Sequence, residues 1–479
     1  MRPRLEANRP LIKRDMHQIV LDRELIRKYG TRGPRYTSYP TADRFIEAFD
    51  ADSYRHWMEH RGVGGLNKPI GLYVHIPFCG TACWYCTCNR IATRDRSRAV
   101  RYLEYLEREL ALQARSIGTA EIQQMHWGGG TPTFLSDRQI EALVRRMEGY
   151  FCFAPGGGRS IELDPRRVGP ETVPLLAGLG FNRISIGVQD FDPDVQRAVN
   201  RLQSMEQTLA VIQAARAHRF HSLSLDLIYG LPKQTETGFG ATLDRVLECA
   251  PDHIALYSYA HLPAQFKPQR RIADSDLPAP EAKLQLMVEA VRRFAEAGYV
   301  HIGMDHFSRP QDDLALAQSR GRLVRNFQGY AATGDLDTAG LGVSAISQVG
   351  PAYSQNHKTL AGYYHSLDAG ELPVWRGLEL THDDLVRRAV IQAIACHFAV
   401  SMESITIAHL IDFQSYFAGE IQRLQPLIED GLVEMDDEWI NVTPSGRLVV
   451  RSVCMVFDRY LREREERQAG SRARYSTVV

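Results

Sequence analysis

The sequence predicts an α/β protein built on a partial, open parallel β/α barrel, followed by a mainly helical, winged-helix-like C-terminal part. Two observations predict this fold. From Ile70 to about residue 310, short apolar strands alternate with helical segments, the pattern of βαβ units with a parallel sheet. The alternation yields fewer units than a complete eight-stranded barrel needs, so we expect the barrel to stay open.

The individual elements follow from this pattern. We expect strands at 71–76, 122–127, 160–163, 183–188, 222–228, 253–259 and 300–304, and helices near 97–117, 137–151, 171–178, 193–199, 205–217, 237–249 and 280–297. Ser136 with Gln139, and Ser204 with Gln207, have the spacing of a capping box and mark two helix starts.

The segments outside residues 70–310 show other sequence patterns. Residues 1–69 carry turn signals and one amphipathic stretch over 46–60, and after about residue 310 the alternation fades. Helices are expected at 382–400 and 404–430, followed by a hairpin and a helix from Val449. Helices before a two-stranded wing resemble a winged helix, but this segment has no basic stripe, which favours a structural role over DNA binding.

Composition excludes several classes of protein. Of 479 residues, 44% are hydrophobic and 24% charged, which is typical of a folded globular protein and not of a disordered one. The chain has no apolar run long enough to span a membrane, and its polar N-terminus is unlike a signal peptide, so we expect a cytoplasmic protein. The 57 basic and 57 acidic residues cancel, which predicts no nucleic-acid or membrane partner.

The basic residues are uneven, with seven lysines and 50 arginines. A GC-rich genome is sufficient to explain this bias. The alternative interpretation is that a few arginines bind carboxylates, for which the planar guanidinium is better suited than lysine. Composition alone leaves both interpretations open.

Four of the eight cysteines fall within ten residues: Cys79, Cys83, Cys86 and Cys88. In a reducing compartment such a group is more often metal-binding or catalytic than disulfide-bonded. The spacing C-x3-C-x2-C lets one loop present three thiolates to an iron–sulfur cubane. Cys88 could be the fourth ligand, or one iron could stay open to bind a ligand. We expect the other cysteines, Cys152, Cys249, Cys396 and Cys454, to be ordinary buried thiols.

Polar residues gather where the predicted strands end. Parallel α/β sheets bind ligands beyond the carboxyl ends of their strands. The second strand ends in 128–133, GGGTPT, whose glycines allow close backbone approach. Alternation points Glu162 inward, where ribose hydroxyls could donate to it; a salt bridge to Arg166 is the alternative. Further polar residues at strand ends are Asp164, Gln189, Asp190, Asp226 and His261, which predict a polar pocket beside the cysteines.

The string YVHIPFCGTACWYC, residues 73–86, resembles the signature of the radical S-adenosylmethionine superfamily. Together with Cys88 and the strings GGGTPT, IELDP, SIGVQDF, DLIYGLP, YAHLP, GMDHF and RNFQGY, the chain resembles the oxygen-independent coproporphyrinogen III oxidases over nearly its whole length. The barrel is then expected to be of the radical S-adenosylmethionine type.

The resemblance implies a ligand set. Cys79, Cys83 and Cys86 would hold one [4Fe–4S] cluster whose open iron binds S-adenosylmethionine, so that Cys88 would not be a ligand but a residue needed for activity. The family holds two S-adenosylmethionine molecules. Tyr73, Gly129, Glu162 and Ile346 match positions around the first. Tyr85, Gly130, Thr131, Gln189, Arg201, Asp226 and Ala260 match positions around the second. Phe327 and Gln328 match residues near the site.

The implied reaction is the oxidative decarboxylation of two propionate side chains of coproporphyrinogen III to vinyl groups, giving protoporphyrinogen IX. A 5′-deoxyadenosyl radical would take a hydrogen atom from each propionate, and a reduced flavodoxin or ferredoxin system would supply electrons. We expect a monomer. Arg35 and Arg325 are candidates to hold the propionates, because they lie inside matched motifs.

Two related kinds of protein are alternatives: a haem-binding chaperone-like protein and a haem-degrading radical S-adenosylmethionine enzyme. A third alternative is a binding module whose cluster is purely structural. Cys88, RNFQGY and the first 60 residues favour the oxidase. The expected domains are an N-terminal extension over the active site (1–69), the barrel (70–310), a connecting segment contributing to the site (311–380), the C-terminal domain (381–462) and a charged tail (463–479).

Overall fold

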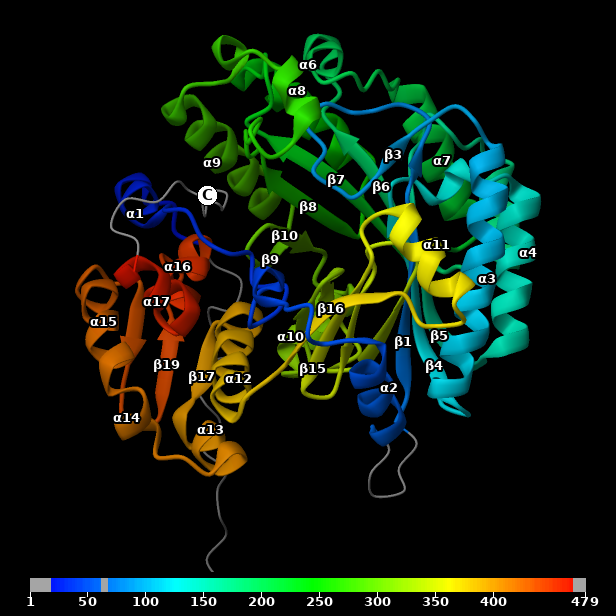
Figure 1. The fold of residues 1–479 in the computed structure, drawn as a ribbon. Coiled ribbons are helices and arrows are strands. Elements are labelled where there is room, and N and C mark those ends of the chain that lie inside the picture. The colour runs from blue at the N-terminus through cyan, green and yellow to red at the C-terminus, as the bar shows by residue number, and fades with distance from the viewer. Residues whose placement is uncertain (1–18, 62–67, 468–479) are drawn as a thin grey trace, which may run out of the picture.

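The protein is organised around one large curved sheet. The computed structural model describes residues 19–61 and 68–467 (Figure 1). Within this part, a 12-stranded sheet has the order β16-β15-β14-β13-β1-β4-β5-β6-β7-β8-β10-β9. Its middle, from β13 to β8, is parallel throughout. These parallel strands are β1 (Ile70–Ile76), β4 (Glu121–Gly129), β5 (Cys152–Leu163), β6 (Arg183–Gln189), β7 (Ser222–Tyr229), β8 (His253–Ser258) and β13 (Asp337–Leu341).

The predicted open parallel β/α barrel is confirmed, and its first six predicted strands are neighbours in chain order. The seventh lies at the edge: β9 (Val300–Gly303) pairs antiparallel with β10 (His306–Ser308), which pairs antiparallel with β8. The β9–β10 hairpin therefore ends the run of parallel strands.

The strand–helix alternation fades after residue 310, as expected, but the sheet continues beyond it. β13 adds parallel to β1, and β14 (Ile346–Val349), β15 (Ala352–Asn356) and β16 (Val374–Glu379) extend it antiparallel. The sequence pattern does not predict these strands, because no long helix separates them. The βαβ units are recognised by the helices between their strands.

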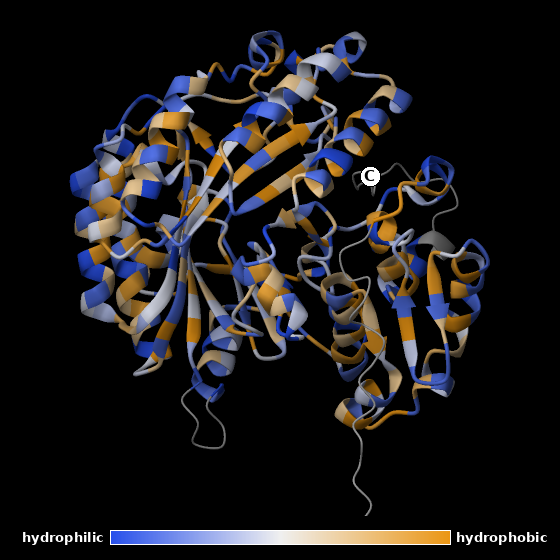
Figure 2. Ribbon diagram, turned by 180° about the vertical axis from the view of Figure 1, so that it is seen from behind, coloured by the Kyte–Doolittle hydropathy of each residue, from blue (hydrophilic) through white to orange (hydrophobic). Residues whose placement is uncertain are grey.

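Helices cover the outer face of the parallel run. They are α3 (Ser97–Ile117), α4 (Asp137–Tyr150), α5 (Thr172–Gly178), α7 (Met205–Ala217), α8 (Glu236–Glu248) and α9 (Pro280–Glu296). The short α6 (Pro193–Ala198) packs elsewhere, because Val195 lies in a separate apolar cluster with Ile228 and Leu231. Both predicted capping boxes are present at the starts of α4 and α7. Along β6 and β7, buried aliphatic residues alternate with more polar, less buried ones, so one face packs on the helices and the other faces the barrel interior (Figure 2).

The C-terminal part is mainly helical, as predicted, with a three-stranded sheet β17-β19-β18 (Ala399–Ser401, Trp439–Val442, Val433–Met435). The predicted helices are shorter than expected. α12 (His382–His397) ends because Phe398 is left-handed, with φ 58°. The 404–430 segment divides into α13 (Met402–His409), α14 (Phe413–Tyr416) and α15 (Ala418–Glu429), because Leu410 is left-handed, with φ 53°.

Two terminal elements connect this part to the rest. α16 (Val450–Val456) and α17 (Arg459–Arg467) follow the small sheet, and α1 (Arg23–Tyr29) lies beside them in Figure 1. Ser452 in α16 donates to the carbonyl of Tyr29 at 2.6 Å. α2 (Ala51–His60) packs on α3 and β16. The predicted tail lies outside the described residues from position 468 onward. No helix in the described part of the chain is long and apolar enough to cross a membrane.

Candidate active site

The four clustered cysteines lie on the loop that follows β1. The short strands β2 (Phe78–Cys79) and β3 (Ile91–Ala92) pair with each other and close this loop at its base. Cys79 and Cys83 are buried, Cys86 is partly buried and Cys88 is exposed. Trp84 donates its backbone N–H to the carbonyl of Val199 at 2.9 Å, and the Asn200 amide donates to the carbonyl of Ala82 at 2.8 Å. The loop after α6 thus fixes the cysteine loop from the side.

Positive groups surround these thiols. Arg166 and Arg201 approach Cys83 Sγ at 3.6 and 3.7 Å. Arg90 donates to the Cys83 carbonyl at 2.7 Å. Burial lowers the pKa of Arg90, but the charge and hydrogen bond of Cys86 outweigh this and raise it. Guanidiniums at this distance favour thiolates over thiols.

Cys86 and Cys88 differ in protonation. The hydrogen bond from Cys88 lowers the pKa of the Cys86 thiol to about 6, with Arg90 assisting against burial. The same bond and the Cys86 charge raise the pKa of Cys88. Cys86 is therefore the thiolate of this pair, and Cys88 keeps its proton.

The donor set fits an iron–sulfur cluster. Three soft thiols with the spacing of cluster ligands share one loop, and cations that favour the thiolate form surround them. In the described part of the chain, no three His, Cys, Asp or Glu side chains are grouped so as to hold a metal ion. Such a group would be needed for a single metal ion, and an iron–sulfur cluster differs from it. A cubane spreads its ligands further apart, because each thiolate binds a different iron.

The glycine run packs directly against the start of the cysteine loop. Gly129 has φ 112°, and a Cβ there would meet the His75 ring at 2.6 Å. A Cβ at Gly130 would meet the Pro77 carbonyl oxygen at 2.6 Å. Neither position tolerates a side chain without movement. Beyond them, the buried Thr131 hydroxyl donates to Cys79 Sγ at 3.5 Å.

Glu162 points into the barrel, as the alternation predicts, and its side chain is 45% exposed there. The Nε2–H of His126 donates to Oε1 at 3.4 Å and the Gly129 N–H donates to Oε2 at 3.3 Å. Enclosure raises the pKa of Glu162, but these two hydrogen bonds outweigh it and keep the pKa below its usual value. The alternative salt bridge to Arg166 is wrong, because Arg166 pairs with Asp164 at 2.6 Å.

Tyr73 lies on the same side of the barrel. Its hydroxyl hydrogen-bonds His75 Nδ1 at 3.1 Å, and its ring stacks on His126 with centroids 5.9 Å apart. Tyr73 is opposite Gly340 in the β1–β13 pairing, and a Cβ on Gly340 would meet the Ile346 carbonyl at 2.5 Å. Tyr73, Gly129, Glu162 and Ile346 are thus connected through short contacts in the structure.

The residues matched to a second cofactor molecule form two groups. Arg201 donates to the Gly187 carbonyl at 2.5 Å, and it is buried, as is Gln189 Oε1, which has no hydrogen-bond partner among the described residues. Gln269, which is fully buried, donates to the carbonyls of both Tyr85 and Ala260 at 3.1 Å. Gln269 therefore connects Tyr85 and Ala260, which form the second group.

Asp226 faces the interior from β7, between these groups and Glu162. Ser185 donates to both of its carboxylate oxygens at 3.2 Å. Burial, and then the charge of Glu162, raise the pKa of Asp226 to about 7. Two facing carboxylates thus share the interior, and Asp226 is the one that takes up a proton first.

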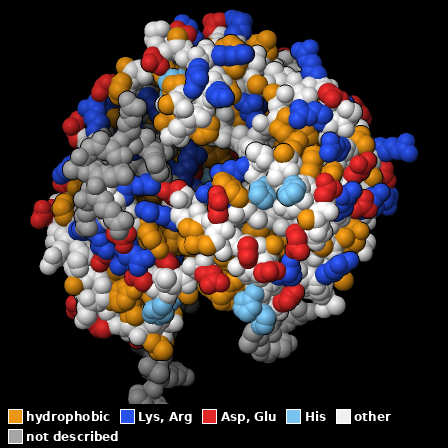
Figure 3. Space-filling model, in the orientation of Figure 1, with side chains coloured by type: hydrophobic (Ala, Val, Ile, Leu, Met, Phe, Trp, Pro, Cys, Tyr) orange, Lys and Arg blue, Asp and Glu red, His pale blue; other side chains and the backbone are white. Residues whose placement is uncertain are grey.

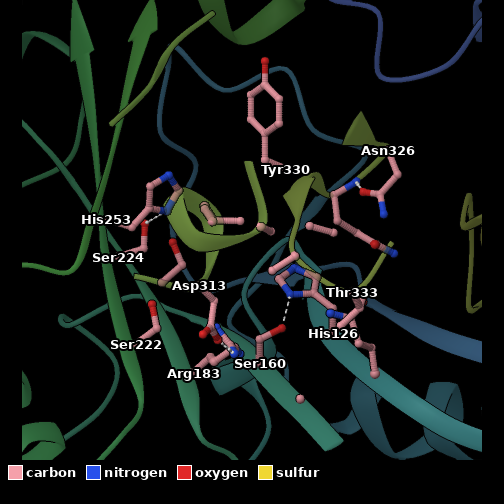
Figure 4. Close-up of a pocket in the computed structure, with 18 of the residues that line it drawn as sticks. His126, Ser160, Arg183, Ser222, Ser224, His253, Asp313, Asn326, Tyr330 and Thr333 are labelled. Atoms are coloured by element: carbon pink, nitrogen blue, oxygen red, sulfur yellow. Dashed lines mark hydrogen bonds and ion pairs between the residues drawn. The ribbon is translucent and has the colours of Figure 1, made fainter. Parts of the chain in front are cut away.

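A cavity of about 430 Å³ fills the barrel interior, and Figure 4 shows the end away from the cysteine loop. Glu162, Asp226 and Gln328 line it. Ser224 hydrogen-bonds His253 Nδ1 at 3.0 Å, and His253 Nε2 hydrogen-bonds His306 Nδ1 at 2.9 Å. The predicted polar pocket is confirmed only in part: Glu162 and Asp226 line this cavity, whereas the other predicted strand-end residues (Asp164, Gln189, Asp190 and His261) and the four clustered cysteines are not among its lining residues. The cavity extends along the barrel to α10 (Asp313–Ser319).

Some predicted residues lie elsewhere. Asp190 accepts from Gln234 and Thr242, both at 2.6 Å, and is a satisfied core group. His261 pairs with Asp274 outside this cavity, at 3.0 Å. Phe327 packs against Phe45 and Tyr353, with ring centroids 6.5 and 5.7 Å away.

Of the isolated cysteines, Cys249, Cys396 and Cys454 are buried as expected, but Cys152 is exposed, because it opens β5 at the end of the strand.

Sequence reasoning missed several residues of the site. His126 could have been found, because alternation along β4 places it on the face opposite Met125 and Trp127. Arg90 and Gln269 carry no such signal, because Arg90 donates to a backbone carbonyl of its own loop and Gln269 donates to the carbonyl of Tyr85, which is 184 residues away in the sequence.

Comparison with known proteins matches this geometry to a family. Residues 73–246 match the radical SAM superfamily, and residues 380–449 match the HemN C-terminal domain. The oxygen-independent coproporphyrinogen III oxidase of Pseudomonas aeruginosa is 48% identical over 96% of this chain and 98% of its own length. This chain belongs to the oxygen-independent coproporphyrinogen III oxidase family.

Two further relatives agree with this placement in the oxidase family. The Escherichia coli oxygen-independent coproporphyrinogen III oxidase is 46% identical over 95% of this chain and 99% of its own length. The solved structure of coproporphyrinogen III oxidase (HemN) from Escherichia coli, described as a radical SAM enzyme, has a TM-score of 0.88. It covers 93% of this chain and all of its own chain at 45% identity. The chaperone-like and haem-degrading alternatives are not favoured.

Proposed function

We propose that this chain oxidatively decarboxylates two propionate side chains of coproporphyrinogen III to vinyl groups, giving protoporphyrinogen IX. Each propionate loses a hydrogen atom to the 5′-deoxyadenosyl radical, then CO2, and one electron that passes to an electron acceptor other than oxygen. The observation that carries this proposal is the loop of four clustered thiols after β1, in a chain that matches an oxidase over 96% of its length. Glu162 connects this loop to the polar barrel cavity, because its charge acts on Cys88 and its side chain lines the cavity.

Cys79, Cys83 and Cys86 are our proposed ligands of one [4Fe–4S] cluster, with S-adenosylmethionine on the remaining iron. When bound, this pair supplies a 5′-deoxyadenosyl radical by one-electron cleavage of S-adenosylmethionine. The chain's part is to hold and orient these groups and to exclude water. Arg90, Arg166 and Arg201 support the thiolate form of the ligands.

We assign the first S-adenosylmethionine to Tyr73, Gly129, Glu162 and Ile346. Glu162 supports this assignment because its carboxylate is ionised, faces the cavity and is fixed by two donors. It keeps further acceptor positions free for ribose hydroxyls. The backbone at Gly129 lies close to Tyr73 through the His75 ring.

A second S-adenosylmethionine is our proposal for the remaining group: Tyr85, Gly130, Thr131, Gln189, Arg201, Asp226 and Ala260. The unpartnered Gln189 oxygen supports it, because a buried acceptor needs a donor and a ligand amine would supply one. Asp226 could accept a second hydrogen bond from the same ligand.

Cys88 is proposed to act on the substrate side without binding iron. It is exposed, lies two residues after Cys86, and its charge environment includes Glu162. Its thiol could donate a proton or hydrogen bond to a substrate group. Phe327 and Gln328 are proposed to contact the substrate, since Gln328 lines the cavity.

The remaining parts of the proposal concern partners and organisation. A reduced flavodoxin or ferredoxin system would supply electrons to a monomer. Residues 1–69 would cover the site, 70–310 would form the barrel, 311–380 would contribute to the site and 381–462 would form the C-terminal domain. Arg35 supports the proposal that the N-terminal segment covers the site, because its guanidinium lies over the ring of Tyr257, which lines the cavity.

The test is anaerobic turnover of the reconstituted protein with coproporphyrinogen III, S-adenosylmethionine and a strong reductant. We expect two 5′-deoxyadenosines and two CO2 for each protoporphyrinogen IX formed. Methylation of the porphyrin, or haem degradation without vinyl product, would identify one of the alternative relatives instead.

A further inference from the structure

Exposed arginines lie along the cysteine loop. Near the start of the loop, Ala92 is opposite Cys79 in the β2–β3 pairing, and the exposed Arg94 comes two residues later. Further along the loop, the Thr81 hydroxyl accepts a hydrogen bond from the exposed Arg167 at 2.8 Å. Two segments far apart in sequence thus bring guanidiniums to the part of the loop that holds Cys79.

A third segment borders the other end of the loop. Arg271 is exposed, and its guanidinium lies over the Trp84 ring, 5.7 Å from the ring centroid. It belongs to the short 3-10 helix η4 (Lys267–Arg271), which Gln269 fixes to the loop by donating to the Tyr85 carbonyl at 3.1 Å. We call the exposed cations of the three segments the basic rim: Arg94, Arg96, Arg98, Arg167, Lys267, Arg270 and Arg271.

The positive charge of the basic rim is not neutralised within the described part of the chain. There, no side chain of the rim forms an ion pair with a carboxylate. Arg96 faces the Phe134 ring at 5.7 Å, and Arg270 donates to the Pro263 carbonyl at 3.0 Å. These partners are uncharged, so the rim presents positive charge to the solvent.

One acidic residue lies within these segments. Asp95 is the only carboxylate in 92–98 and 267–271, and it accepts hydrogen bonds from the backbone and the hydroxyl of Ser97 at 2.9 and 2.6 Å. Asp95 offsets at most one charge of the rim. Exposed arginines elsewhere, such as Arg145, pair with a carboxylate, so the arginine-rich composition alone does not explain the rim.

The basic rim is a local feature of the surface. The whole chain has 57 basic and 57 acidic residues, so the surplus at the loop is balanced elsewhere on the molecule. Figure 3, in the orientation of Figure 1, shows Lys and Arg side chains at the surface in the region of β3. A concentration of one sign of charge attracts a partner of the opposite charge and orients it during encounter. The rim therefore favours an acidic partner at the cysteine loop.

We propose that the basic rim docks an acidic protein that carries one electron and delivers it to the cluster at the cysteine loop. The inference rests on the proposed function, because only a chain that holds the cluster needs this electron. The carrier loses one electron and the cluster gains it, passing from [4Fe–4S]2+ to [4Fe–4S]+, and no proton is transferred. Thr81, beside Arg167, lies between Cys79 and Cys83 in sequence, which favours an electron carrier over a nucleic acid as the partner.

The test uses flavodoxin, an acidic protein whose flavin hydroquinone gives one electron. Two double variants reverse charges at different parts of the rim: Arg167→Glu with Arg271→Glu, and Arg94→Glu with Arg98→Glu. Arg423→Glu is the matched control, because Arg423 is exposed on α15, in the C-terminal part. Stopped-flow absorbance follows cluster reduction in the reconstituted protein, and calorimetry measures flavodoxin binding. Photoreduced 5-deazariboflavin, a small uncharged reductant, is the second electron donor.

We expect flavodoxin to reduce each double variant about 10- to 100-fold more slowly than the wild type at low salt, because steering by charge is lost. Flavodoxin binding should weaken in parallel. The difference should shrink at about 0.5 M salt, which screens exposed charges. Reduction by 5-deazariboflavin and the iron content should be unchanged in both double variants, and Arg423→Glu should match the wild type throughout.

Three results would overturn the inference. The first is that flavodoxin reduces both double variants as fast as the wild type at low salt. The second is that both double variants lose iron or react slowly with both reductants, which indicates that the rim stabilises the loop. The third is that a short RNA binds the wild type but neither double variant, and does not slow reduction by flavodoxin, which indicates a nucleic-acid surface.

One further result separates this inference from the proposed function. A wild type whose cluster is reduced by flavodoxin through the rim, but which forms no 5′-deoxyadenosine with S-adenosylmethionine and coproporphyrinogen III, would overturn the proposed function and support the docking surface.

Discussion

The backbone N–H of Gly129 donates to the carboxylate of Glu162 at 3.3 Å, which joins the glycine run after β4 to the end of β5. Two sequence motifs 33 residues apart therefore form one structural unit. Strand pairing explains it, because β4 and β5 are parallel neighbours and their carboxyl ends meet at the same edge.

We expect Glu162→Ala to keep the iron–sulfur cluster and lose S-adenosylmethionine binding. The loss of a charge-assisted contact should cost about 1.5–3 kcal/mol. Calorimetry on the reconstituted protein measures it. Asp313→Asn is the control, since Asp313 pairs with Arg183 and His221 at the far end of the same cavity. Equal affinity in Glu162→Ala and wild type would remove Glu162 from the cofactor site.

Replacing Cys79, Cys83 or Cys86 by Ser should abolish the cluster in each case. One loop supplies the three proposed ligands, and losing any of them would leave a second iron without protein support. Iron and sulfide analysis is the measurement, with the exposed Cys152→Ser as the control that keeps full iron. A variant that retains about four irons per chain would show that its cysteine is not a ligand.

Much of this arrangement could be predicted from sequence. The spacing of the cysteines, the strand alternation around Glu162 and the capping boxes at Ser136 and Ser204 are local signals, and each has a local physical cause. The extension of the sheet beyond residue 310 could not be predicted, because β13, β14 and β15 follow one another without an intervening helix and only the short α11 (Leu360–Asp368) precedes β16, so the alternation that marks βαβ units is missing. The Gln269 contacts depend on tertiary packing alone.

Asp226→Asn should stabilise the protein at neutral and higher pH. The pKa of Asp226 is 3.8 before burial and about 7 in the fold, because burial and Glu162 raise it. Between these values the folded protein holds a proton that the unfolded chain lacks, so the free energy of unfolding falls as pH rises from about 4 to 7. The variant removes this loss, on the order of 2–4 kcal/mol.

Melting curves at pH 5 and pH 8 test this prediction. The melting temperature of Asp226→Asn should exceed that of the wild type by more at pH 8 than at pH 5. The Ser185 hydroxyl can still donate to the amide oxygen, so packing should be kept. An equal difference in melting temperature at both pH values would contradict the raised pKa of Asp226.

Cys88→Ser should keep full iron content and S-adenosylmethionine binding and lose vinyl product. Its thiol lies on the loop of the proposed ligands but is exposed, so the change removes a substrate-side group and leaves the cluster intact. Iron, binding and product are measured on one preparation. Iron loss would make Cys88 a ligand, and full product formation would remove it from the reaction.

We expect a radical derived from S-adenosylmethionine to take hydrogen from the propionate side chains. The direct measurement is mass spectrometry of 5′-deoxyadenosine after turnover of coproporphyrinogen III deuterated at the propionate β-carbons. We predict one deuterium in each 5′-deoxyadenosine and two labelled molecules for each protoporphyrinogen IX. Vinyl product formed together with unlabelled 5′-deoxyadenosine would show that the 5′-deoxyadenosyl radical does not take hydrogen from the propionates.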